Sequence, residues 1–151
     1  MGLYNLCIVD RSGTVLLSYY FSAATRLEQD AYEVAATAAS ALWATPHGGL
    51  TGGSGDQCFI CDGHPVVVRV TRDLVFMLSG SEDMEEIALS ETLDYAVAVV
   101  DATCDNVLTA SQLMSYHGKI AVCLREMFYG GHLYTTDTET VLRNAKLKGV
   151  Q

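Results

Sequence analysis

The chain has 151 residues, of which 50% are hydrophobic and 18% are charged. This length and composition predict one globular domain spanning residues 1–151 and exclude a disordered chain. The formal net charge of −9 argues against nucleic acid as a partner and against direct attraction to an acidic membrane. No apolar run reaches the roughly 20 residues that cross a bilayer, so we expect a cytoplasmic protein.

The N-terminal third predicts a β-hairpin followed by a helix. Residues 3–9 and 14–21 are rich in β-prone side chains, and the four-residue turn between them ends in Gly13. Apolar residues then recur at helical spacing over about residues 25–44, after which a Thr-Pro pair ends the helix. Five glycines in residues 47–56 predict a loop.

The middle of the chain predicts three short strands and a long helix. Residues 57–60, 64–70 and 74–79 are β-prone and are separated by turn sequences. Ser81 is a suitable N-cap, and acidic residues follow it in the first turn of the helix. The apolar stripe of this helix continues to about residue 105.

The C-terminal part predicts two further helices. The first covers about residues 109–129 and is ended by a Gly-Gly pair. Thr136 and Glu139 have the spacing of a capping box for a short last helix, which runs to about Leu147. The complete order predicts an α+β fold, with a five-stranded antiparallel sheet flanked by helices and a short C-terminal helix.

A possible metal site begins at Cys58, Cys61 and His64. Cysteine and histidine at this spacing can open a zinc site, but a closed site needs four ligands and no second Cys-x-x-Cys is present. On a strand, residues three apart also point to opposite faces. We therefore expect buried structural cysteines and no metal, with zinc binding as the competing interpretation.

The other candidates for chemistry lack a necessary partner. The glycine-rich residues 48–55 do not continue into the lysine of a phosphate-binding loop and do not open a helix. Ser81 has no nucleophile-elbow sequence around it. Cys123 and His117 are predicted to lie on different faces of one helix. We expect no catalytic residue and no cofactor, so the chain is predicted not to be an enzyme.

Large apolar side chains of the first hairpin, the first helix and the next strand are the candidate partner interface. Aromatic residues are favoured as interface anchors, so an exposed docking surface is one interpretation. The competing interpretation is that the same residues only close the core. The predicted surface comprises Tyr19, Phe21, Leu27, Tyr32, Leu42, Trp43 and Phe59.

Three segments resemble the coatomer zeta subunit family. They are residues 28–33 (EQDAYE), residues 73–81 (DLVFMLSGS) and residues 126–131 (EMFYGG), the last continuing without a gap to Gly149. The glycine-rich loop at 47–56 departs from the zeta pattern, as does the register in the segment before Gly118. The similarity covers most of the chain, but its motifs are packing and capping signals.

The resemblance implies a longin (profilin-like) domain that acts as a small, zeta-like subunit of the COPI coatomer vesicle coat. Such a chain is a non-catalytic scaffold held by the gamma-type large subunit within the coat complex. An Arf-family GTPase would recruit that complex to Golgi membranes for Golgi-to-ER and intra-Golgi transport. Two alternatives remain open, namely a sigma-type small subunit of a clathrin adaptor complex and a longin-fold tether subunit.

Overall fold

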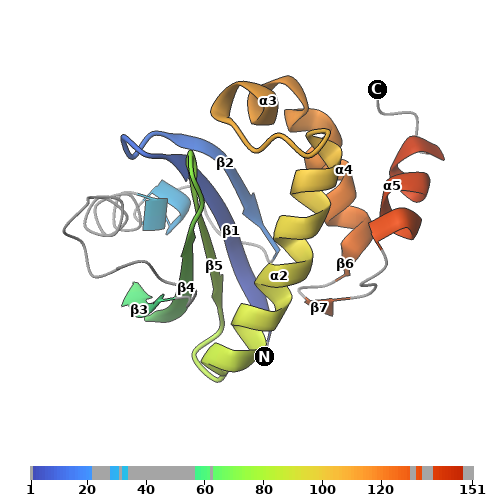
Figure 1. Ribbon diagram of the computed structural model, residues 1–151. Coiled ribbons are helices and arrows are strands. Elements are labelled where there is room, and N and C mark those ends of the chain that lie inside the picture. Colours follow the sequence, from blue (N-terminus) through green and yellow to red (C-terminus); the bar gives the residue numbers. More distant parts are fainter. Residues whose placement is uncertain are drawn as a thin grey trace.

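The computed structural model describes residues 2–21, 28–30, 32–33, 57–61, 63–129, 132–133 and 138–147. Within these residues the chain forms a central sheet with helical segments on both sides (Figure 1). Several predicted features lie outside the described residues: the loop at 47–56, the Gly-Gly helix end, Thr136 of the capping box, and Leu27, Leu42 and Trp43 of the predicted interface.

The sheet contains five strands, which confirms the prediction. They are β1 (Leu3–Asp10), β2 (Val15–Tyr20), β3 (Gln57–Cys61), β4 (His64–Val70) and β5 (Leu74–Gly80). Their spatial order is β2-β1-β5-β4-β3, and every neighbouring pair is antiparallel. β2 and β3 therefore form the two edges of the sheet, whereas β1 and β5, the first and last strands in the sequence, lie inside it.

The turn between β1 and β2 is built by Asp10. Its carboxylate accepts hydrogen bonds from the backbone amides of Ser12 and Thr14, both at 2.9 Å, and from the Ser12 hydroxyl. These bonds hold the pKa of Asp10 below its ordinary value. Gly13 has a φ of 93°, a conformation that other residues rarely adopt. The predicted turn is thus fixed by one side chain and one glycine.

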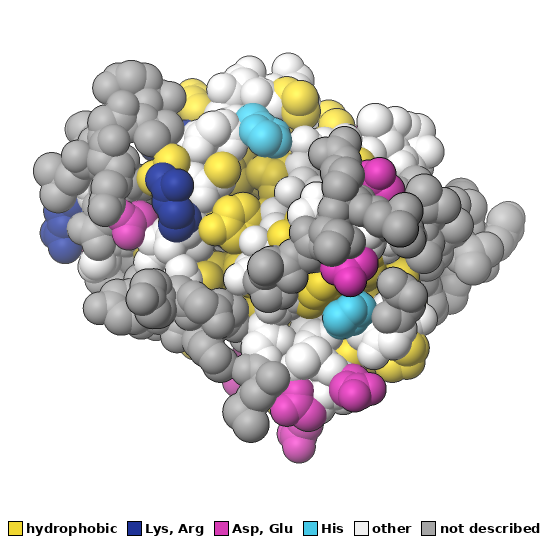
Figure 2. All heavy atoms as spheres, turned by 180° about the vertical axis from the view of Figure 1, so that it is seen from behind, with side chains coloured by type: hydrophobic (Ala, Val, Ile, Leu, Met, Phe, Trp, Pro, Cys, Tyr) yellow, Lys and Arg dark blue, Asp and Glu magenta, His cyan; other side chains and the backbone are white. Residues whose placement is uncertain are grey.

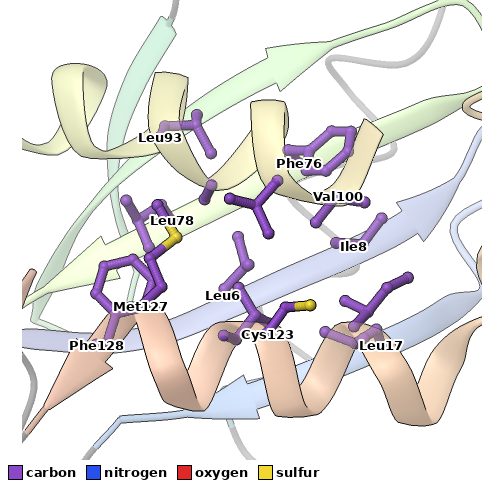
Figure 3. Close-up of a cluster of buried hydrophobic side chains, with 14 of the residues drawn as sticks. Leu6, Ile8, Leu17, Phe76, Leu78, Leu93, Val100, Cys123, Met127 and Phe128 are labelled. Carbon is purple, nitrogen blue, oxygen red and sulfur yellow. The ribbon is translucent and has the colours of Figure 1, made fainter. Parts of the chain in front are cut away.

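Side-chain alternation along the strands divides the core into two layers. On one side of the sheet, apolar residues of β1 and β5 pack against the C-terminal helices. On the other side, the alternate residues of the same strands pack around Tyr32, which belongs to helical residues 28–30 and 32–33. Figure 3 shows the first layer, where Leu93, Val100, Cys123 and Met127 meet Leu6, Ile8, Phe76 and Leu78.

The long helix α2 (Glu86–Thr103) begins four residues later than predicted, with Glu85 at the N-cap position. Ser81 is not its N-cap, because the Ser81 hydroxyl accepts a hydrogen bond from the Gly2 amide and donates one to Asp83. Ser81 instead ties the start of β1 to the end of β5. The buried face of α2 comprises Leu89, Leu93, Ala96, Val99, Val100 and Thr103.

The helix predicted over residues 109–129 is two helices, α3 (Ala110–Ser115) and α4 (His117–Met127). Thr109 caps α3 by accepting a hydrogen bond from the Gln112 amide at 3.2 Å. The break falls at Tyr116, whose hydroxyl donates to Asp105 at 2.8 Å. Serine, tyrosine, histidine and glycine, which follow one another at residues 115–118, are weak helix formers, and this run favours a break.

After α4, a short strand β6 (Phe128–Tyr129) pairs with β7 (His132–Leu133). The final helix α5 (Thr138–Leu147) confirms the predicted C-terminal helix, and its Val141 is buried in the core. In the described ranges, none of the helices combines the length and apolar character needed to span a membrane.

Gly80 and Gly118 provide a matched test of this packing. A Cβ at Gly80 would lie 2.6 Å from the Met84 sulfur and 3.2 Å from both the Gly2 carbonyl oxygen and Leu89. We expect Gly80→Ala to lower the free energy of unfolding by about 1–3 kcal/mol, as overpacking does. A Cβ at Gly118 meets no atom within 4 Å, so Gly118→Ala should stabilise α4 by about 0.5–1 kcal/mol.

Urea unfolding of both variants measures these changes. Equal effects of the two substitutions would contradict the close approach of β1, β5 and α2 at Gly80.

Candidate functional site

A network of hydrogen bonds on the sheet face opposite α2 begins at Tyr32. Its side chain is fully buried, and its hydroxyl donates to the Ser79 hydroxyl at 2.9 Å. Ser79 in turn donates to the carbonyl oxygen of Asn5 at 3.3 Å. Burial raises the pKa of Tyr32, so the phenol remains a neutral donor. The network joins the first helical segment to β5 and β1.

Glu33 makes a second connection, to the edge strand β2. Its carboxylate accepts hydrogen bonds from the Tyr20 hydroxyl at 2.8 Å and from the Ser18 hydroxyl at 3.3 Å. The Tyr20 hydroxyl also lies 3.2 Å from the carbonyl oxygen of Gln29. Burial, followed by the bond to Glu33, raises the pKa of Tyr20. The helical segment is therefore bound to the sheet at two successive residues, 32 and 33.

Four aromatic rings surround these bonds. Tyr4 stacks on His64 with ring centroids 4.0 Å apart, and it meets Tyr20 and Tyr32 edge to face at 5.5 and 5.1 Å. The Nδ1 atom of His64 lies 3.0 Å from the carbonyl oxygen of Gly80. Rings from β1, β2, β4 and the first helical segment thus form one cluster, which orients that segment on the sheet.

The four predicted interface residues that the structure describes belong to two different layers of the core, so these four do not share one surface. Tyr19 and Phe21 lie on the α4 side of the sheet, where the Phe21 ring is 4.7 Å from Phe128. Tyr32 and Phe59 pack on the opposite side. Strand alternation and the strand order cause this separation, because they send the two groups to different layers. Tyr32 closes the core, as the competing interpretation had it.

Tyr19 and Phe21 differ from Tyr32 in being only partly buried. Their rings lie 5.0 Å apart and meet edge to face. Figure 2 shows that hydrophobic side chains reach the surface on the side of the molecule hidden in Figure 1. The contact of Tyr19 and Phe21 with a partner stays a prediction.

The cysteines occupy separate positions in the two layers. Cys58 packs against the α2 side of the core and Cys61 against the other side, which confirms that the two thiols face opposite ways. Among the described residues, no three His, Cys, Asp or Glu side chains are grouped so that they could hold a metal ion. None of the five cysteines forms a disulfide bond, and burial raises the pKa of Cys7 to about 12. On α4, Cys123 is buried and His117 is exposed, so the two residues lie on different faces of the helix, as predicted.

Sequence reasoning missed most members of the network. Tyr4 was not singled out, His64 was considered only as a possible metal ligand, and Glu33 and Ser79 appeared only inside segments that carry the family resemblance. One available signal was a polar residue inside an otherwise apolar strand, because a buried polar group needs a partner. Ser79 in β5 is such a residue.

Two tyrosine-to-phenylalanine substitutions test whether Tyr32 anchors the fold. Tyr32→Phe removes a buried hydrogen bond, so we expect the free energy of unfolding to fall by about 1 kcal/mol. Tyr116→Phe removes the same atom from an exposed bond to Asp105 and should cause a smaller change. Thermal unfolding of both variants decides the point. Unfolding curves in which Tyr32→Phe matches the wild type would contradict the anchoring role.

Comparison with known proteins places the chain in a family. The sequence model of the family described as "Clathrin adaptor complex small chain" matches residues 2–150. The chain is 26% identical over 101 residues to coatomer subunit zeta-1 of Oryza sativa subsp. japonica. That match covers 67% of this chain and 57% of the rice protein, which is less than two thirds of its length.

A solved structure has the same fold. A chain of the "Homology model of the full-length AP-3 complex in a stretched open conformation" superposes with a TM-score of 0.65 at 10% identity. The superposition covers 97% of this chain and 93% of that one, which confirms the predicted α+β longin fold. Because the family model matches nearly the whole length of the chain, the chain belongs to the clathrin adaptor complex small chain family.

Proposed function

We propose that this chain is a zeta-like, non-catalytic small subunit of the COPI coatomer vesicle coat. The observation that carries the proposal is the 26% identity to coatomer subunit zeta-1, within a chain whose residues 2–150 match the adaptor small chain family. The described part of the fold supports a scaffold role, because both layers of side chains are used to hold helices on the sheet.

The partner in this proposal is a gamma-type large subunit. After both faces of the sheet are covered, the partly buried side chains of Leu16 and Tyr19 on the edge strand β2, and of Phe21 directly after it, lie on the α4 side. Aromatic residues are common anchors of protein interfaces, where the surrounding contacts exclude water from them. A stable complex needs about 1,600 Å² of buried surface, so this strip would be one part of a larger contact.

Within the same proposal, membrane association is indirect. A net charge of −9 disfavours direct contact with an acidic membrane surface. The assembled coat, recruited by an Arf-family GTPase, would hold the chain on the cytoplasmic side of Golgi membranes and on COPI-coated vesicles. Its transport steps would be Golgi-to-ER and intra-Golgi.

A sigma-type small subunit of a clathrin adaptor complex is the second candidate. It is favoured by the family match itself, which carries the clathrin adaptor description and spans residues 2–150, whereas the zeta match spans 101 residues. The two candidates differ in the large subunit that they bind.

Co-expression distinguishes the two candidates. The tagged chain is produced with the gamma-type coatomer subunit, and separately with each clathrin-adaptor large subunit, from the same cell. We expect a one-to-one complex with the gamma-type subunit alone, measured by size-exclusion chromatography and native mass spectrometry. A complex with a clathrin-adaptor subunit would favour the sigma-type role, and binding to neither would contradict both.

The same assay tests the strip on β2. Tyr19→Ser should weaken binding to the gamma-type subunit about tenfold or more, as loss of an interface anchor does. Ile60→Ser is the control, because Ile60 is 68% exposed on β3, at the opposite edge of the sheet. Unfolding curves of both variants show whether the fold is retained. Equal affinity of the two variants for the gamma-type subunit would contradict a role of Tyr19 in the interface.

A further inference from the structure

The outer side of α2 carries large side chains, Ile87 and Tyr95, that stay exposed among the described residues. Ile87 is 70% exposed and Tyr95 is 40% exposed. Leu89, Leu93 and Val100 on the opposite side of the same helix are buried against the sheet and α4. Figure 1 shows α2 lying along the sheet, with one side turned away from it.

The helical period brings these apolar residues together with carboxylates. Ile87, Glu91 and Asp94 follow one another at spacings of four and three residues, and Tyr95 lies beside them. All four are exposed. The outer side of α2 is thus a mixed stripe in which isoleucine and tyrosine alternate with acidic groups.

The net negative charge of the chain comes from the segment that contains this stripe. Residues 73–118 contain nine of the 18 acidic residues and no lysine or arginine. The rest of the chain has nine acidic and nine basic residues, so the net charge of −9 comes entirely from this segment. One cation reaches the stripe from outside, since Arg69 of β4 forms an ion pair with Asp94 at 2.7 Å.

We propose that the outer side of α2 is a docking surface for a basic amphipathic helix of a protein partner. The apolar side chains of such a helix would cover Ile87 and Tyr95, and its lysine or arginine residues would pair with Glu91 and its neighbours. The negative field of α2 selects a cationic partner and repels nucleic acid and acidic lipid, which leaves a protein segment as the occupant. A helix suits the site because its side chains repeat with the period of α2.

This surface is separate from the strip on β2, and the proposal does not rest on the coat role. The apolar row explains why the acidic field is more than a solvated helix face, since an isoleucine at 70% exposure gains free energy when a partner covers it. The acidic field in turn selects the partner.

A designed peptide serves as the probe. It is an 18-residue amphipathic helix of leucine and lysine, and a leucine–glutamate peptide of the same pattern is its counterpart. Binding to the full chain is measured in 0.15 M salt by fluorescence anisotropy and by amide chemical-shift changes. We expect the lysine peptide alone to bind, with shifts concentrated in residues 86–98.

Two pairs of variants locate the contact. Glu91→Lys and Ile87→Ser should each weaken binding about three- to tenfold, because each removes one class of contact. Asp30→Lys is the charge control on the other side of the sheet, and Met114→Ser is the apolar control, because Met114 is 54% exposed on α3. Both controls should bind nearly as the wild type does.

Several outcomes would overturn the proposal. Equal weakening by Glu91→Lys and Asp30→Lys would mean that the peptide responds only to total charge. Equal weakening by Ile87→Ser and Met114→Ser would mean that the apolar contact does not lie on α2. Failure of the lysine peptide to bind, or shifts outside α2, would exclude the surface altogether.

Discussion

The structure depends on the burial of β1 and β5 on both faces. These two strands lie next to each other inside the sheet, and Leu6, Cys7, Phe76 and Met77 are all fully buried although they point alternately to opposite sides. Apolar strands of this kind cannot leave either face in water, because each buried methylene contributes roughly 0.8 kcal/mol. Each face therefore needs its own cover, which determines the three-layer arrangement.

The two covers are held by different interactions. On one side, α2 and α4 contribute mainly apolar contacts, as Figure 3 shows. On the other side, the first helical segment is held by Tyr32 and Glu33 through hydrogen bonds to strand residues and through the ring cluster around Tyr4. Directional bonds fix the position of a short segment more closely than apolar contact alone. Among the described residues, the edge strands and the outer sides of the helices remain open to partners, which suits a subunit that contributes shape.

Much of the fold could be predicted from the sequence, because strands and helices have local periodic patterns. The five strands and the last helix were predicted within a few residues. Ser81 was misassigned because its hydroxyl is used by Gly2, about 80 positions earlier in the chain, and no local pattern carries that information. The contact of Tyr116 with Asp105, which follows α2, likewise joins residues that no local helical pattern relates.

The candidate site was less predictable for the same reason. The stacking of Tyr4 on His64 requires the order β1-β5-β4, and the separation of Tyr19 from Phe59 requires knowledge of which face each strand turns inward. Composition identifies aromatic residues as candidate anchors, but only the pairing of distant strands decides which of them stay at the surface. Ser79 shows that a polar residue in an apolar strand is the more useful signal.

Amide hydrogen exchange of the lone protein tests the central claim most directly. If burial of β1 and β5 on both faces holds the structure together, their amides exchange only through global unfolding, and both strands share the slowest rate. Amides of the edge strand β3 exchange faster, through local opening. Exchange of β1 or β5 as fast as that of β3 would contradict the account.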